Sequence, residues 1–162
     1  MNGLTTIQEK FTADIIETHA FRGDETIVVR PPALLMIAKY LKEVMQFDFL
    51  MDLTAVDYLF FAGGRIQKDF RFEVVYHFYS LKNNTRLRLK VAVDEKEPEV
   101  DSVTSLWSSA DWYEREVWDM YGIRFKEHPN LKRILMYEEF KGHALRKDYP
   151  YNKRQPLIGP EN

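Results

Sequence analysis

Three side chains in one stretch of the sequence are of the types that general acid–base catalysis uses. Glu114 and Glu116 stand two residues apart, and His128 follows a short distance along the chain. Carboxylates and imidazoles are among the groups that most often move protons in enzymes. Residues two apart on a helix, however, point to different sides. We therefore expect the two glutamates to flank an apolar helix face on opposite edges, and an independent hydrolase built on these three residues is a minor alternative.

The rest of the sequence offers few other reactive groups. There are no cysteines, which excludes disulfides, thiol catalysis and cysteine-ligated metal centres. The four histidines lack the spacing of known zinc motifs, and no Walker, dinucleotide-binding or nucleophile-elbow pattern is present. We therefore expect no cofactor, no metal and no catalytic residue in this chain.

Composition and charge indicate one soluble globular domain. The chain has 162 residues, of which 45% are hydrophobic, enough to bury a core. Its formal net charge of -2 is too close to neutrality for a general nucleic-acid-binding protein. We find no signal-peptide core, and no apolar run approaches the roughly 20 residues that span a bilayer. Any membrane association is expected to be indirect, through partner proteins.

Apolar residues recur at three- and four-residue spacing in three segments, which predicts three helices. These are residues 4–19, a segment opened by Pro31-Pro32, and residues 109–121, which stop at Gly122.

Alternating apolar residues predict four strands, the last two joined as a hairpin at Asn83-Asn84. The strands are residues 26–30, 49–56, 70–79 and 86–93. The resulting order predicts an α+β fold with a mostly antiparallel four-stranded sheet and helices packed on it, in a ferredoxin-like arrangement. The hairpin is expected to have one apolar face and one basic face.

The basic face of the hairpin could bind nucleic acid, an RNA-binding module being the corresponding hypothesis. Its cations are Arg71, Arg86, Arg88 and Lys90. Stacking aromatics should be interleaved with such charges, and few are present. A solvated face or a charged contact with a protein is favoured, so we expect no nucleic-acid partner.

The third helix is unusual on its polar side. Asp111, Arg115 and Asp119 stand four residues apart, which predicts a ladder of ion pairs. Trp112 and Trp118 also project away from the apolar stripe. Flanking loops could cover them, but tryptophan and arginine are enriched in protein interfaces, which favours contact with a partner.

The chain loses periodicity after residue 137. Residues 138–162 are basic, punctuated by proline and poor in apolar side chains. We expect an α+β domain over residues 1–137 and an extended C-terminal tail over 138–162 that becomes ordered on a partner, with simple disorder as the alternative.

One set of residues resembles the signature of the C subunit, or 30 kDa subunit, of NADH:quinone oxidoreductase, the respiratory complex I. The spaced groups are Glu114-Arg115-Glu116, Asp119-Met120-Tyr121, His128, Lys132 and Ile134. Residues 142–150, GHALRKDYP, also resemble the C-terminal segment of that family. Glu127 and Ala144 depart from the family pattern, where glycine and proline are frequent.

The resemblance implies a non-redox subunit of the peripheral arm that scaffolds the quinone-reducing module. It would pack against subunits D, B and I of the arm, with D the nearest, while other subunits bind NADH and quinone. The expected location is the cytoplasmic side of a bacterial inner membrane. An equivalent subunit of an energy-converting hydrogenase or another membrane dehydrogenase is the alternative. The predicted interface residues are Trp112, Glu114, Arg115, Glu116, Trp118, Asp119, His128, Arg133, Arg146, Lys147, Asp148 and Tyr149.

Overall fold

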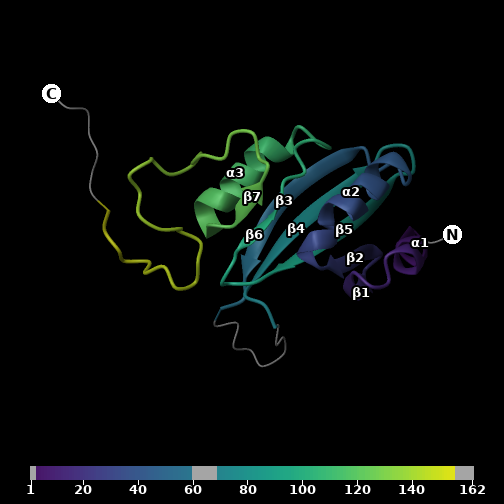
Figure 1. Cartoon of the computed structure of the whole chain (residues 1–162), viewed down its shortest axis with the longest axis horizontal. Coiled ribbons are helices and arrows are strands. Elements are labelled where there is room, and N and C mark those ends of the chain that lie inside the picture. Colours follow the sequence, from purple (N-terminus) through teal and green to yellow (C-terminus); the bar gives the residue numbers. More distant parts are fainter. Residues whose placement is uncertain (1–2, 60–68, 156–162) are drawn as a thin grey trace.

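The computed structural model describes residues 3–59 and 69–155, which form an α+β fold around a mixed five-stranded sheet (Figure 1). Its strand order is β1-β2-β5-β4-β3. Neighbouring strands are antiparallel except β2 and β5, which run parallel. The strands are β1 (Ile15–Phe21), β2 (Asp24–Val29), β3 (Phe49–Asp57), β4 (Phe72–Ser80) and β5 (Thr85–Val93). A second sheet pairs β6 (Glu99–Asp101) with β7 (Arg124–Lys126) in parallel.

In the described part of the chain, three α-helices accompany the sheets: α1 (Gly3–Lys10), α2 (Leu34–Glu43) and α3 (Ala110–Tyr121). Helix α2 follows a short 3₁₀ turn, η1 (Pro31–Ala33), whose prolines suit a first helical turn because they need no amide donor there. Among the described residues, no helix combines the length and apolar character needed to cross a membrane.

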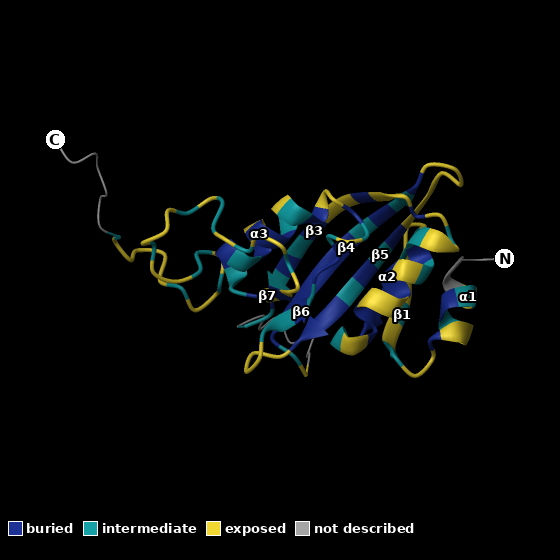
Figure 2. Ribbon diagram, turned by 45° about the horizontal axis from the view of Figure 1, so that its top comes forward, coloured by how far each residue is buried: buried dark blue, intermediate teal, exposed yellow. Residues whose placement is uncertain are grey.

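The core lies between one face of the large sheet and the helices. Phe72, Val74, Tyr76 and Phe78 alternate along β4 and are fully buried, and the inner side of α2 joins the same cluster. Each such side chain stabilises the fold by about 1.5–3 kcal/mol through removal from water. Figure 2 shows the exposed residues on the outer side of α2 and along the chain after α3.

The α+β class is confirmed, but the helix expected over residues 4–19 is wrong in its second half. The helix ends at Lys10, and Ile15–Phe21 instead forms β1, which pairs with β2. Arg22 and Gly23 adopt positive φ angles of 53° and 87° and close this hairpin. The β-branched residues of this segment favour a strand once a neighbour is available to pair with. The sheet therefore has five strands, not four.

The hairpin of β4 and β5 is confirmed, and Asn84 has the positive φ, 51°, that the turn requires. Its basic face differs from the expectation. The Lys90 Nζ lies 2.7 Å from a Glu73 carboxylate oxygen. Arg71, just before β4, is buried against acidic side chains. Much of the expected positive charge on this face is therefore paired within the chain.

Candidate partner interface

Helix α3 and the chain that follows it hold most of the predicted interface residues. The helix buries Ala110, Val117 and Met120 on its apolar side and ends at Gly122, whose φ is 74°. A Cβ on Gly122 would lie 2.5 Å from His143 Nε2. Glycine is thus required twice here, for its left-handed backbone and for the close approach of the tail.

Asp119 is buried and binds the chain after β7. Its Oδ2 accepts the backbone N–H groups of Ile134, Leu135 and Met136 at 3.1, 2.9 and 2.8 Å, and its Oδ1 pairs with Arg133. Burial opposes ionisation of Asp119, but the Met136 N–H, the Arg133 guanidinium and the other two amides outweigh it and hold the pKa below its usual range. Asp119 therefore fixes the path of residues 133–136.

Arg115 binds the same segment from the neighbouring turn of the helix. Its guanidinium donates to the carbonyl of Lys132 at 3.1 Å and to that of Arg133 at 3.2 Å. The expected ladder of Asp111, Arg115 and Asp119 is therefore wrong. Their spacing permits ion pairs, but the last two bind the following segment because it covers this side of α3.

The tail caps the carboxyl end of α3. His143 Nδ1 lies 3.0 Å from the carbonyl oxygen of Asp119, Leu145 N–H donates to that of Met120 at 3.0 Å, and Arg146 Nε donates to that of Tyr121. The last carbonyls of a helix have no partner inside the helix. The tail supplies these partners, so its path over α3 is fixed by hydrogen bonds.

Arg71 joins the tail to the sheet, in what we name the Arg71 cluster: Arg71, Asp57, Glu95 and Asp148. Arg71 bonds Asp57 through two nitrogens at 3.1 and 2.9 Å, Asp148 at 2.8 Å, and also Glu95. Asp57 additionally accepts the Lys147 N–H at 2.9 Å. The bond to Arg71 lowers the pKa of Asp148. In Asp57, burial opposes ionisation, but Arg71 and the Lys147 amide outweigh it and lower the pKa.

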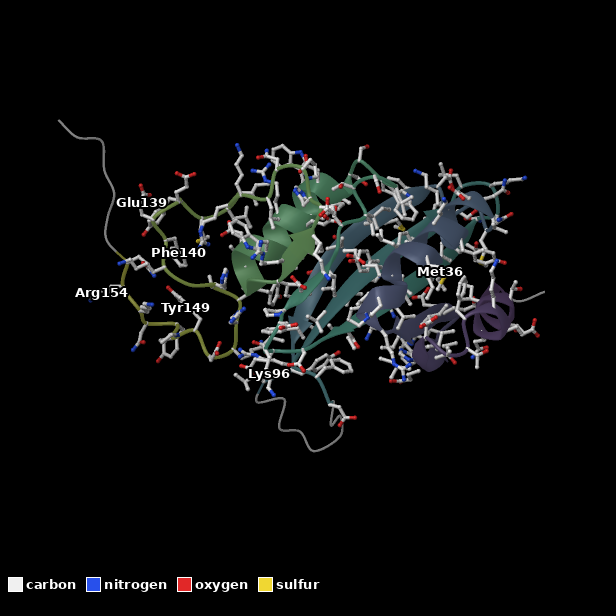
Figure 3. All side chains as sticks on the ribbon, in the orientation of Figure 1. Met36, Lys96, Glu139, Phe140, Tyr149 and Arg154 are labelled. Carbon is white, nitrogen blue, oxygen red and sulfur yellow. The ribbon has the colours of Figure 1, made fainter. Side chains whose placement is uncertain are left out.

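The tail also folds back on itself between Phe140 and Tyr149. Phe140 and Tyr149 stack with ring centroids 5.8 Å apart. Figure 3 shows both residues at the end of the molecule remote from Met36. Arg133 donates to the carbonyls of Phe140 and Gly142. Residues 138–155 contain no helix or strand. Residues 156–162 of the predicted tail lie outside the described part of the chain.

The predicted interface residues fall into three groups by exposure. Glu114, Arg115 and Asp119 are buried. Half-buried residues are Trp118, His128, Arg133, Arg146 and Tyr149, and exposed residues are Trp112, Glu116, Lys147 and Asp148. Their role in partner contact stays a prediction.

The tryptophans of α3 differ in environment. Trp118 packs against the core, with the Arg133 guanidinium 5.8 Å from its ring centroid. Trp112 is 63% exposed, and the Arg115 guanidinium lies 5.2 Å from its ring centroid. Trp112 is thus the large apolar side chain that α3 presents outward.

The acid–base interpretation fails on placement. The side chains of Glu114 and His128 have no exposed surface, whereas Glu116 is exposed on another side of α3. The structure therefore does not bring the three together in an open site. Among residues 3–59 and 69–155, no group of three or more histidine or acidic side chains is arranged to hold a metal ion.

Sequence reasoning missed Asp57 as the partner of Arg71. The available signal was an acidic residue at the end of one predicted strand and an arginine at the start of the next. Paired strand ends meet in a sheet, and the structure does pair Asp57 with Phe72, beside Arg71. The contact with Asp148 had no local signal.

The fold and its buried polar network define a structural domain that holds a tail against one helix. Its family follows from sequence comparison. The chain belongs to the family described as respiratory-chain NADH dehydrogenase, 30 Kd subunit, whose model matches residues 27–155.

Curated relatives and solved structures agree with this family. The C subunit of the NADH-quinone oxidoreductase of Geotalea uraniireducens is 45% identical over 155 residues, 94% of this chain and 90% of the relative. Its counterpart from Geobacter sulfurreducens is 44% identical, over 94% and 92%. A structure titled as the trypsin-resistant fragment (1-134) of Nqo5 is 31% identical with a TM-score of 0.71, covering 81% of this chain and all of the fragment. A chain of an archaeal membrane-bound sulfane sulfur reductase, 21% identical with a TM-score of 0.74 over 92% and 84%, shares the fold.

Proposed function

We propose that this chain is the C subunit of a proton-translocating NADH:quinone oxidoreductase. It is a non-redox subunit of the peripheral arm, and it scaffolds the module that reduces quinone. The family match over residues 27–155 carries the proposal. The contacts of the signature residues also support it. Asp119 and Arg115 bind the backbone of the segment that follows β7, and they do not line an open site.

The partners in this proposal are the neighbouring peripheral-arm subunits D, B and I, of which D is the nearest, while other subunits bind NADH and quinone. The proposed contact surface joins Trp112 on α3 to the chain after β7. The segment after β7 carries large apolar side chains on its surface: Leu135 is 56% exposed, Leu145 is 49% exposed and Tyr151 is fully exposed. Tryptophan, tyrosine and arginine are enriched at the centres of protein–protein interfaces, and this surface combines exposed tryptophan and tyrosine with cationic side chains.

The tail is the second part of the proposed surface. A related structure is titled as a trypsin-resistant fragment (1-134) of Nqo5 and covers 81% of this chain. In this chain the tail is held by the Arg71 cluster and by the end of α3 instead of by core packing. We place the boundary between domain and tail near residue 138, and the assembled complex on the cytoplasmic side of a bacterial inner membrane.

The test is co-purification of the tagged full chain from membranes in mild detergent. The expected result is recovery of the other peripheral-arm subunits with NADH:quinone oxidoreductase activity. Trp112→Ala should weaken their retention by about tenfold or more. Met36→Ala is the matched control, because Met36 is also exposed but lies on α2, far from the tail (Figure 3). A monodisperse chain that retains none of these subunits contradicts the proposal.

The hydrogenase alternative differs in the proteins recovered. The curated relatives described above are named as NADH-quinone oxidoreductase subunits, which favours that enzyme. Recovery of a hydrogenase catalytic subunit instead would reverse the preference.

A further inference from the structure

Ionisable side chains from three elements meet in the interior beside α3. Glu114 comes from α3, Tyr76 from β4 and His128 from the turn after β7. The side chains of Glu114 and His128 have no exposed surface, and Tyr76 is fully buried. Asp111, one turn before Glu114, lies at the rim with its side chain 37% exposed. The chain thus encloses an acid next to an imidazole away from solvent.

The two oxygens of Glu114 have different surroundings. Oε1 accepts the backbone N–H of Val103, just beyond β6, at 2.7 Å. Oε2 is buried and accepts no hydrogen bond from the described residues. The side chain beside it that could carry a positive charge is His128, whose Nε2 lies 3.9 Å away. A buried carboxylate oxygen that carries negative charge without a donor is strongly unfavourable.

His128 does not supply the missing positive charge. The Asn130 N–H donates to Nδ1 at 3.0 Å, so Nδ1 carries no proton. The ring proton therefore sits on Nε2, which lies 3.1 Å from the carbonyl oxygen of Asp111 and 3.2 Å from its Oδ1. The donor of the ring therefore faces Asp111, not Glu114 Oε2.

We propose that Glu114 carries a proton on Oε2 in the folded protein and that this buried proton makes the packing of α3 against the fold dependent on pH. The proton comes from solvent and returns to it. While the proton is bound, the neutral acid keeps its bond to the Val103 amide without a buried charge. When the proton leaves, the bond from the Val103 N–H becomes stronger, but the interior then holds an anion whose Oε2 has no donor, so the folded state loses stability.

Some of the groups around Glu114 raise its pKa and others lower it. Burial raises the pKa of Glu114 to about 7, the Ser102 hydroxyl and the Val103 N–H oppose this shift, and the Asp111 charge adds to it. Burial raises the pKa of Tyr76, and the Asp101 charge adds to this shift, so this hydroxyl stays neutral. The buried charge therefore forms as the pH rises through neutrality, and it makes the stability of the packing around α3 sensitive to pH.

The test is the pH dependence of urea unfolding of the full chain, compared with Glu114→Gln. Relative to Glu114→Gln, the wild-type midpoint should fall as the pH rises from about 4.5 to about 7 and level off above, because over this range the folded state keeps a proton that the unfolded state has lost. Glutamine resembles the protonated acid and cannot titrate, so the difference between the two proteins isolates Glu114 from other titrating groups such as His77 and His143, whose pKa values burial lowers. Glu116→Gln, on the same helix but exposed, is the control and should keep the wild-type slope. A Glu114→Gln slope equal to that of the wild type overturns the proposal.

A second measurement uses the wild-type chain alone, in case the variant does not fold. The Val103 amide resonance reports directly on the oxygen that it binds. It should shift with a midpoint near neutral pH, and a midpoint near the ordinary glutamate pKa of about 4.3 overturns the proposal. Both measurements use the isolated chain, so their outcome is independent of the proposed assembly with partner subunits.

Discussion

The Asp119 carboxylate and the Arg133 guanidinium form an ion pair between the last turn of α3 and the chain after β7, and each also binds backbone beyond the pair. Asp119 receives three consecutive amides, and Arg133 reaches two carbonyls of the tail. The pair thus connects the helix, the exit segment and the tail.

Replacing Asp119 by asparagine should destabilise the fold by about 3 kcal/mol. Removal of one charge leaves the other uncompensated, and the new amide group directs N–H donors at N–H donors. Urea unfolding measures the loss. Glu116→Gln is exposed and should stay within about 0.5 kcal/mol of wild type. Equal stability of the two variants would show that the buried carboxylate is dispensable.

The Arg71 cluster separates the stability of the sheet from the attachment of the tail. Arg71→Met should cost about 3–5 kcal/mol, because it leaves the buried Asp57 carboxylate without its cation. Asp148→Asn removes only the tail's partner, which is about half exposed, and should cost about 1 kcal/mol or less.

Hydrogen exchange distinguishes these two effects. In Asp148→Asn, the Leu145 amide, which bonds the end of α3, should exchange faster, while amides of β4 stay protected. If both regions exchange faster by the same factor, the tail is not a separate unit.

Two glycines allow strain and steric clash to be measured separately. Gly122→Ala should destabilise the chain by more than Gly23→Ala. Both have positive φ, which costs alanine about 1–2 kcal/mol, but a Cβ at Gly122 also meets His143 and Arg146, whereas nothing lies within 4 Å at Gly23. The difference between the two unfolding free energies gives the clash. Equal losses would mean that the tail yields freely at this point.

The two tryptophans of α3 should respond differently to truncation. Trp118→Ala should cost about 2 kcal/mol of folding stability, since the indole packs on the core. Trp112→Ala should change stability by about 0.5 kcal/mol or less, since its ring is mostly exposed. Thermal unfolding of the isolated chain provides the comparison. Equal losses would place both rings in the core.

Acid should release the tail before the core unfolds. The pKa values of Asp57, Asp119 and Asp148 are held low in the folded chain, so their contribution is full above the unfolded value of 3.8 and is lost as the pH falls through the folded values. The pKa of Glu114 is raised instead, so its contribution to stability is lost as the pH rises. Burial lowers the pKa of His77 and of His143, so these two add stability as the pH rises through 6.5 and partly offset the loss from Glu114. A difference in unfolding free energy between wild type and Glu114→Gln that stays constant from about pH 4.5 to about pH 7 would contradict the Glu114 contribution.

The sequence predicted the elements whose pattern is local. The hairpin of β4 and β5 and the end of α3 at Gly122 follow from alternation, asparagine and glycine, and the structure has them. It did not predict β1, because Ile7, Phe11 and Ile15 also fit a helical period, and the strand depends on a neighbour to pair with. The exit segment that turns Arg115 and Asp119 inward, and the contact of Arg71 with Asp148, depend on tertiary packing that spacing along one helix does not encode.

The parallel pairing of β2 with β5 constrains the order in which the chain can fold. These strands lie far apart in the sequence, and α2, β3 and β4 come between them. Such non-local pairing slows folding, because a long loop must close before the contact contributes. During synthesis, β1 and β2 must wait for β5 to leave the ribosome before the sheet is complete. The hairpins of β1 with β2 and of β4 with β5 are both local, so each can form before the parallel pairing joins them.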